Sequence, residues 1–260
     1  MGHMIPVKKK FKRRGIFLLP NLLTTAALFA GFYSIVAAVD GNFDKAGAAI
    51  FIAMVLDGLD GRVARLTNTS TQFGKEYDSL SDMVSFGLAP AVVVYEWGVA
   101  RLTEWNVAWG RVGWLVAFLF VVAAALRLAR FNAQAAGTSK RFFVGLPSPS
   151  AAALVAAFVW LGSELELAGL GGLALAFAVT AAAAVLMVSS FRYYSFKEVS
   201  LGSRIPFTYL IGIVLIFILI ALDPPFVFLV LFGAYAASGP IYWLWRRRAL
   251  RPAGGTDNDG

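Results

Sequence analysis

Long apolar stretches constrain the fold of this chain more than any other feature of its sequence. Charged residues divide the 260 residues into eight such stretches, 59% of all residues are hydrophobic, and the mean hydropathy is +0.71. Most of the stretches approach the roughly 20 residues that a helix needs to cross a bilayer. The sequence therefore predicts an all-α integral membrane protein with about eight transmembrane helices. The expected spans are 17–38, 46–66, 78–98, 110–131, 144–163, 167–190, 205–222 and 225–245.

The basic residues predict how these spans are oriented in the cell membrane. With a cytoplasmic N-terminus, all of the 23 Lys and Arg residues except Lys45, Arg101 and Arg111 fall on the cytoplasmic side. The positive-inside rule therefore places both termini on that side. The basic run from Lys8 to Arg14 is typical of segments that bind anionic lipid headgroups, and it also serves as an orientation signal. Because topology explains the net charge of +8, nucleic acid is not expected as a partner.

The ends of the chain are expected to lie outside the catalytic unit. Residues 1–15 comprise an expression scar (MGHM) and the basic juxtamembrane segment, 16–245 form one transmembrane domain, and 246–260 form a cytoplasmic tail. The first apolar run is too long for a cleaved signal peptide. The absence of cysteine excludes disulfides and thiolate chemistry.

Four aspartates interrupt the apolar pattern: Asp57, Asp60, Asp78 and Asp82. Ionisable residues at membrane depth are costly, and they are functional candidates by default. At helical spacing, Asp57 and Asp60 share one face, while Asp78 and Asp82 form a stripe on a second helix. Two facing helices would bring the four carboxylates together as a site for Mg²⁺ or Mn²⁺, which prefer hard oxygen ligands. The alternative, an acidic solvated loop, has no reason to keep two helical registers.

The spacing of these residues resembles a family signature. The pattern D-x2-D-G-x2-A-R-x8-G-x3-D-x3-D of the CDP-alcohol phosphotransferases matches the chain at every fixed position. These positions are Asp57, Asp60, Gly61, Ala64, Arg65, Gly74, Asp78 and Asp82. The resemblance implies a membrane enzyme, expected as a homodimer, that transfers a substituted phosphate from a CDP-linked donor to an alcohol and releases CMP.

The resemblance also implies roles for individual residues. Asp57, Asp60 and Asp78 would mainly hold two metal ions, and Asp82 would deprotonate the acceptor hydroxyl and also touch a metal. Near the start of the first span, Asn21 and Thr24 lie one turn apart and would reach the donor nucleotide or its metal, although both are also ordinary helix-capping residues. The full set of expected donor-binding residues is Asn21, Thr24, Gly61, Ala64, Arg65 and Gly74.

Three further segments, GKEYDSLSDMVSFGLAP, RLARFN and GLPSP, resemble the phosphatidylserine synthase branch of this family. That resemblance implies CDP-diacylglycerol as donor, L-serine as acceptor, and phosphatidylserine and CMP as products. An archaeol-based donor remains an alternative. Serine carries a carboxylate, so cations and polar groups at the cytoplasmic ends of the fourth and fifth spans are expected to bind it, although the arginines are also explained by topology. The expected acceptor-binding residues are Arg127, Arg130, Asn132 and Ser148.

Two other functions remain open at this point. Within the family, the acceptor could be glycerol phosphate, inositol phosphate or choline. A cation transporter is the remote alternative, but it predicts acidic groups near the bilayer midplane and two related halves. The aspartates here cluster at one edge of the membrane beside Arg65, and no internal repeat is present.

Overall fold

The computed structural model describes residues 18–67, 69–99, 106–134, 142–167, 169–194 and 207–249. The predicted juxtamembrane segment 1–15 and most of the predicted tail 246–260 lie outside these residues. Within them the chain is almost entirely helical. The helices are α1 (Leu18–Val39), α2 (Phe43–Leu66), α3 (Gln72–Asp82), the π-helix η2 (Met83–Leu88), α4 (Ala89–Trp97), α6 (Val107–Gln134), α7 (Ser148–Glu164), α8 (Leu170–Val188), α9 (Phe207–Leu222) and α10 (Pro224–Ala249).

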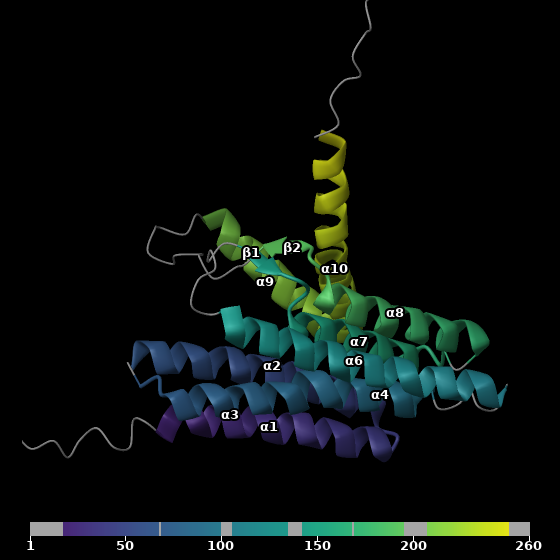
Figure 1. Ribbon diagram of the computed structural model, residues 1–260, viewed down its shortest axis with the longest axis horizontal. Coiled ribbons are helices and arrows are strands. Elements are labelled where there is room, and N and C mark those ends of the chain that lie inside the picture. The colour runs from purple at the N-terminus through teal and green to yellow at the C-terminus, as the bar shows by residue number, and fades with distance from the viewer. Residues whose placement is uncertain are drawn as a thin grey trace, which may run out of the picture.

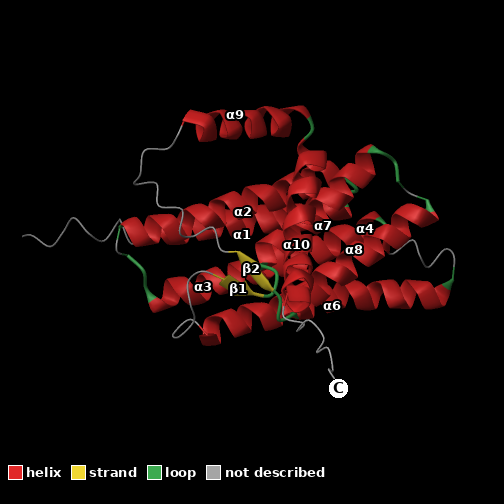
Figure 2. Ribbon diagram, turned by 90° about the horizontal axis from the view of Figure 1, so that it is seen from above, coloured by secondary structure: helices red, strands yellow, loops and turns green. Residues whose placement is uncertain are grey.

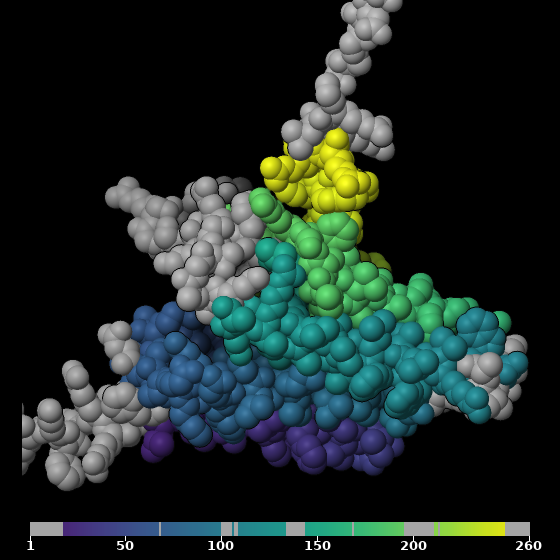
Figure 3. All heavy atoms as spheres, viewed as in Figure 1, coloured from purple at the N-terminus to yellow at the C-terminus, as the bar shows by residue number. Residues whose placement is uncertain are grey.

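The helices pack into a bundle that one helix crosses. Helices α1 to α8 lie side by side along the long axis of the molecule, whereas α10 runs across them (Figure 1). The view from above shows the same crossing, with α9 set apart beside the bundle (Figure 2). In the space-filling view, the far part of α10 stands out from the packed helices (Figure 3). The polar connection between α2 and α3 and the start of α1 lie at the same end of the bundle (Figure 1).

The prediction of a helical membrane protein is confirmed. Among the described residues, four helices are long and apolar enough to span a bilayer: Leu18–Val39, Trp109–Ala133, Leu170–Val188 and Pro224–Arg247. The predicted third span corresponds to α3, η2 and α4, which follow one another directly along the chain. The number eight stays a prediction, because α7 and α9 have only 17 and 16 residues and α2 carries charges.

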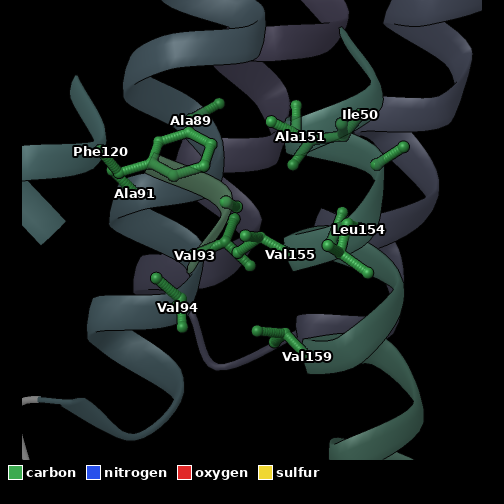
Figure 4. Close-up of a cluster of buried hydrophobic side chains, with 14 of the residues drawn as sticks. Ile50, Ala89, Ala91, Val93, Val94, Phe120, Ala151, Leu154, Val155 and Val159 are labelled. Carbon is green, nitrogen blue, oxygen red and sulfur yellow. The ribbon is translucent and has the colours of Figure 1, made fainter. Parts of the chain in front are cut away.

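Small residues fill the interior of the bundle. Figure 4 shows Val93 of α4 and Val155 of α7 facing each other within a buried cluster that also holds Ile50 of α2, Val94 of α4 and Phe120 of α6. Alanines at many of the remaining buried positions let the backbones approach closely. Many other large apolar side chains lie on the outside, and Phe29 and Phe217 are each 68% exposed. This distribution suits a protein whose outer surface contacts lipid.

A short β-ribbon was not predicted from the sequence. Strands β1 (Phe142–Val144) and β2 (Arg192–Tyr194) pair antiparallel, with Phe143 opposite Tyr193. The predicted fifth span was therefore wrong to begin at residue 144, which belongs to β1. Gly145 follows with φ of +81°, and a Cβ there would lie 2.3 Å from the Met187 carbonyl oxygen. Only glycine fits this turn without strain.

Candidate active site

Two facing helices bring three of the four aspartates together. Asp57 and Asp60 lie toward the end of α2, and Asp78 lies on α3. One carboxylate oxygen from each of the three lies within 4.8 Å of the other two. Asp60 is buried, and Asp57 and Asp78 are half-buried. The predicted facing of the two helices is thus observed, and this cluster could bind a metal ion.

The cluster has the properties that a cation site requires. Three carboxylates this close repel one another, and a divalent cation removes that repulsion. The Oδ1 atom of Asp78 is buried and has no hydrogen-bond partner among the described residues. A buried oxygen without a partner is destabilising, and few are found in native proteins. An ion with a preference for oxygen ligands would satisfy it, so the residues present fit Mg²⁺ or Mn²⁺.

Asp82 occupies a separate position at the end of α3. It lies one turn beyond Asp78, its side chain adjoins that of Asp57, and it is not part of the group of three. The π-helix η2 begins at the next residue. Short π-helical segments occur frequently at functional sites, and the helical periodicity of the sequence did not predict this one. Asp82 therefore lies beside the cluster, where the helix changes its winding.

Helix α1 contributes a hydroxyl to the cluster. The Thr24 hydroxyl donates a hydrogen bond to Asp60 Oδ2 at 2.5 Å. Thr24 is buried, and its carbonyl accepts a hydrogen bond from Ser81 on α3 at 3.2 Å. Thr24 thus fixes one carboxylate and links all three helices of the site. Direct contact of Thr24 with the donor stays a prediction.

A cleft of about 310 Å³ adjoins the aspartates. Residues of α1, α2 and α3 line it, and Asp60 and Asp78 are among them. All six residues expected to bind the donor lie in its wall: Asn21, Thr24, Gly61, Ala64, Arg65 and Gly74. Their separation by up to 53 positions in the chain makes this convergence informative about a shared ligand, although their individual roles remain predictions.

The lining of the cleft adds residues that the sequence analysis missed. Thr69, Ser70 and Thr71 come from the connection between α2 and α3, Lys75 from α3, and Pro20 from α1. The Thr71 hydroxyl caps α3 by accepting from the Gly74 N–H at 3.0 Å. A threonine three residues before a helical glycine N–H is a recognisable capping pattern. It could have indicated that α3 begins at Gln72 and that Thr71 lies at its start, in the lining of the cleft.

Arg127 and Arg130 lie near the end of α6. Arg127 is buried, its Nε donates to the Leu146 carbonyl at 2.6 Å, and it lies within electrostatic reach of Asp82. Arg130 is half-buried and close enough to Arg127 to repel it. Arg127 is therefore the cation near Asp82, and Arg130 lies close to Arg127.

The other two expected acceptor-binding residues are placed differently. Asn132 is exposed, and its Nδ2 donates a hydrogen bond to the Ser79 hydroxyl at 3.0 Å, so Asn132 links α6 to α3. Ser148 is 1% exposed at the first residue of α7. Neither observation tests a role in binding the acceptor, and both roles remain predictions.

Comparison with known proteins agrees with the family that the aspartate motif resembles. Residues 17–189 match the family model described as CDP-alcohol phosphatidyltransferase. A CDP-diacylglycerol–serine O-phosphatidyltransferase of Helicobacter pylori is 37% identical over 230 residues, which are 88% of this chain and 92% of the relative. A protein of the same name from Mycobacterium tuberculosis is 44% identical over 147 residues, 54% of this chain and 49% of the relative.

An archaeal relative is also similar. The archaetidylserine synthase of Methanothermobacter thermautotrophicus is 37% identical over 177 residues, covering 67% of this chain and 69% of the relative. The family match spans every aspartate of the cluster and every residue lining the cleft. The chain belongs to the CDP-alcohol phosphatidyltransferase family.

Proposed function

We propose that this protein transfers the phosphatidyl group of CDP-diacylglycerol to the hydroxyl of L-serine, forming phosphatidylserine and CMP. The observation that carries the proposal is the convergence of six donor-binding candidates on one cleft beside the aspartate cluster. The choice of serine is supported by the names of the relatives from Helicobacter and Mycobacterium.

The aspartate cluster supplies the electrostatic part of this chemistry. Asp57, Asp60 and Asp78 would hold Mg²⁺ or Mn²⁺, with two ions expected and Asp82 as a further ligand. When bound, these ions would neutralise the charge of the donor diphosphate and of the departing CMP. The Thr24 hydroxyl donates to Asp60 and would hold its carboxylate in place as a metal ligand. Because Asp60 is buried, it also stays screened from competing water.

Asp82 is the proposed general base. Its carboxylate takes the proton from the serine hydroxyl as the serine oxygen attacks the phosphorus that bears the diacylglycerol. The bond from that phosphorus to the oxygen of CMP breaks, and CMP leaves with the bonding electrons. The position of Asp82 beside Asp57, rather than within the group of three, supports this separation of roles.

The cleft would orient the donor. Gly61, Ala64 and Gly74 carry little or no side chain, so a nucleotide can lie against the backbones of α2 and α3. Arg65 is exposed at the cleft and would pair with a phosphate, while Asn21 offers an amide to the nucleotide. Across the site, Arg127 and Arg130 would pair with the serine carboxylate, with Asn132 and Ser148 nearby as polar contacts.

The membrane arrangement follows from the same proposal. We expect eight spans, with the site and both termini on the cytoplasmic side of the cell membrane. Arg62 and Arg65 lie at the end of the second span and Lys75 lies before the third, beside the aspartates, where the positive-inside rule expects cations. Serine and CMP are water-soluble, so they would enter and leave from that side.

An acceptor panel tests the proposed function. The purified protein in detergent receives CDP-diacylglycerol, Mg²⁺ and one alcohol at a time: serine, glycerol phosphate, inositol phosphate or choline. CMP release and the lipid product are both measured, and the archaeol-based donor is compared in parallel. Serine should give phosphatidylserine, and EDTA should abolish the reaction until Mg²⁺ or Mn²⁺ is restored. Turnover with another acceptor and none with serine would disprove the serine assignment.

A further inference from the structure

Helices α3, η2 and α4 follow one another without a break, and the side that faces the bundle shifts by one residue along the way. An α-helix makes five turns in 18 residues, so an unbroken helix would place Glu96 on the same face as Asp78. In the structure Glu96 is exposed, whereas its neighbour Trp97 is buried, with its ring 5.9 Å from that of Phe158 on α7. The chain therefore contains one residue more than an α-helix needs between the aspartates and the apolar end of α4.

The π-helix η2 accommodates this extra residue. The N–H of Ala89, at the end of η2, donates to the carbonyl of Val84, five residues earlier, where an α-helix would use the carbonyl of Ser85. One added residue turns the following helix by about 100°. This turn lets Asp78 face α2 while α4 still directs its apolar side into the bundle and Glu96 stays outside.

Two serine hydroxyls fasten this part of the chain to α1. The Ser81 hydroxyl donates to the Thr24 carbonyl at 3.2 Å, and the Ser85 hydroxyl donates to the Ala27 carbonyl, also at 3.2 Å. Both serines are buried, and Asp82 lies between them in the sequence. Helix α1 therefore holds the chain on both sides of Asp82.

Gly31 allows α1 to approach η2 closely at Ser85. A Cβ on Gly31 would lie 2.7 Å from the Ser85 Cα and closer still to its hydroxyl, so only glycine fits here without a shift of the neighbouring helix. This contact leaves Ser85 little room to move. Its hydrogen bond to Ala27 therefore fixes where η2 lies against α1.

We propose that Ser85 is a positioning residue for the reaction: its hydrogen bond to α1 fixes the π-helical turn that directs the Asp82 carboxylate toward the acceptor hydroxyl. This inference rests on the proposed function, in which Asp82 is the general base. A base must lie within hydrogen-bond reach of the proton that it takes, so a small rotation of the helix at Asp82 lowers the rate of proton transfer. Ser85 acts through Asp82 and binds neither substrate.

The test compares two buried serines that make the same kind of contact. Ser34 of α1 is also buried, and its hydroxyl donates to the Ala46 carbonyl of α2 at 2.8 Å. Ser85→Ala should lower the kcat for CMP release about 10- to 100-fold, the scale of a misplacement of about 1 Å. Its KM for CDP-diacylglycerol and its Mg²⁺ requirement should stay within about threefold of wild type. Ser34→Ala should lower the melting temperature but keep kcat near that of wild type.

A second substitution at the same position separates the hydroxyl from the volume of the side chain. Ser85→Cys keeps a weak hydrogen-bond donor, so its kcat should lie between those of Ser85→Ala and wild type. The melting temperature of each purified variant shows whether it is folded. If Ser85→Ala does not fold, Ser85→Cys takes its place in the comparison, with a smaller loss of kcat expected.

A double-mutant cycle tests whether Ser85 acts through Asp82. Asp82→Asn already lacks the base, so adding Ser85→Ala should lower its remaining kcat by less than about twofold. An unchanged kcat in Ser85→Ala, an equal loss in Ser34→Ala, or a full further loss in the Asp82→Asn background would each overturn the inference. A wild-type kcat in Asp82→Asn, or wild-type protein that makes no product with serine, would instead refute the proposed function.

Discussion

The hydrogen bond between Thr24 and Asp60 should determine how tightly the site holds its metal. Thr24→Val keeps the side-chain volume but removes the hydroxyl that donates to Asp60 Oδ2 at 2.5 Å. A hydrogen bond to a charged group contributes about 1.5–3 kcal/mol, and loss of a hydrogen bond to a metal-ligating carboxylate lowers metal affinity about 10- to 100-fold. The Mg²⁺ concentration for half-maximal CMP release should therefore rise by about that factor.

The adjacent residue provides the matched control. The Thr25 hydroxyl donates to the Asn21 carbonyl at 2.7 Å and contacts the Tyr77 hydroxyl at 2.9 Å, but no hydrogen bond is found between it and an aspartate among the described residues. Thr25→Val should leave the Mg²⁺ dependence near that of wild type. CMP release is measured across a Mg²⁺ titration at saturating donor and serine, and high Mg²⁺ should restore most of the Thr24→Val activity. Identical titration curves for wild type and Thr24→Val would refute the reasoning.

Three further predictions concern the aspartates, the acceptor and the topology. Asp82→Asn should still bind CDP-diacylglycerol with metal but lose about 10²- to 10⁴-fold in kcat. Asp57→Asn should instead lose metal binding and donor binding together. Equal donor affinity of the two variants in a binding assay would contradict the separate roles. Arg130→Ala should raise the serine KM about 10- to 150-fold with little effect on the donor KM, and unchanged serine kinetics would remove Arg130 from the acceptor site. Because the chain has no cysteine, a single cysteine can be introduced at Asn42 or at Thr138; an impermeant maleimide should label only the first in intact cells, and the reverse pattern would overturn the orientation.

Much of the site could be predicted from the sequence, because its aspartates are spaced at helical intervals along the chain. Spacings of three and four residues place Asp57 with Asp60 and Asp78 with Asp82, and such spacings depend only on helix geometry. The prediction that α2 and α3 face each other is confirmed by the cluster of Asp57, Asp60 and Asp78. The family prediction is confirmed as well.

What the sequence did not determine depends on contacts between distant segments. The strands are three residues each, too short for any periodicity, and Phe143 pairs with Tyr193 although α7 and α8 lie between them in the chain. The π-helix after Asp82 likewise has no periodic pattern in its sequence.

The sequence by itself determined the membrane class, the helices and the motif that carries the aspartates, because hydrophobic length and helical spacing are local properties of the chain. Only the tertiary structure decided that Thr24 bonds Asp60, 36 residues away, and that Arg127 of α6 bonds the Leu146 carbonyl. The hydrogen bond from the Tyr193 hydroxyl of β2 to the Ala236 carbonyl of α10 shows the reason most clearly. Its partner carbonyl is free because of Pro240, and the space for its ring exists because of Gly239, but the two segments meet only when α10 crosses the bundle. Such complementarity joins residues that have no fixed spacing in the chain, so it arises from packing.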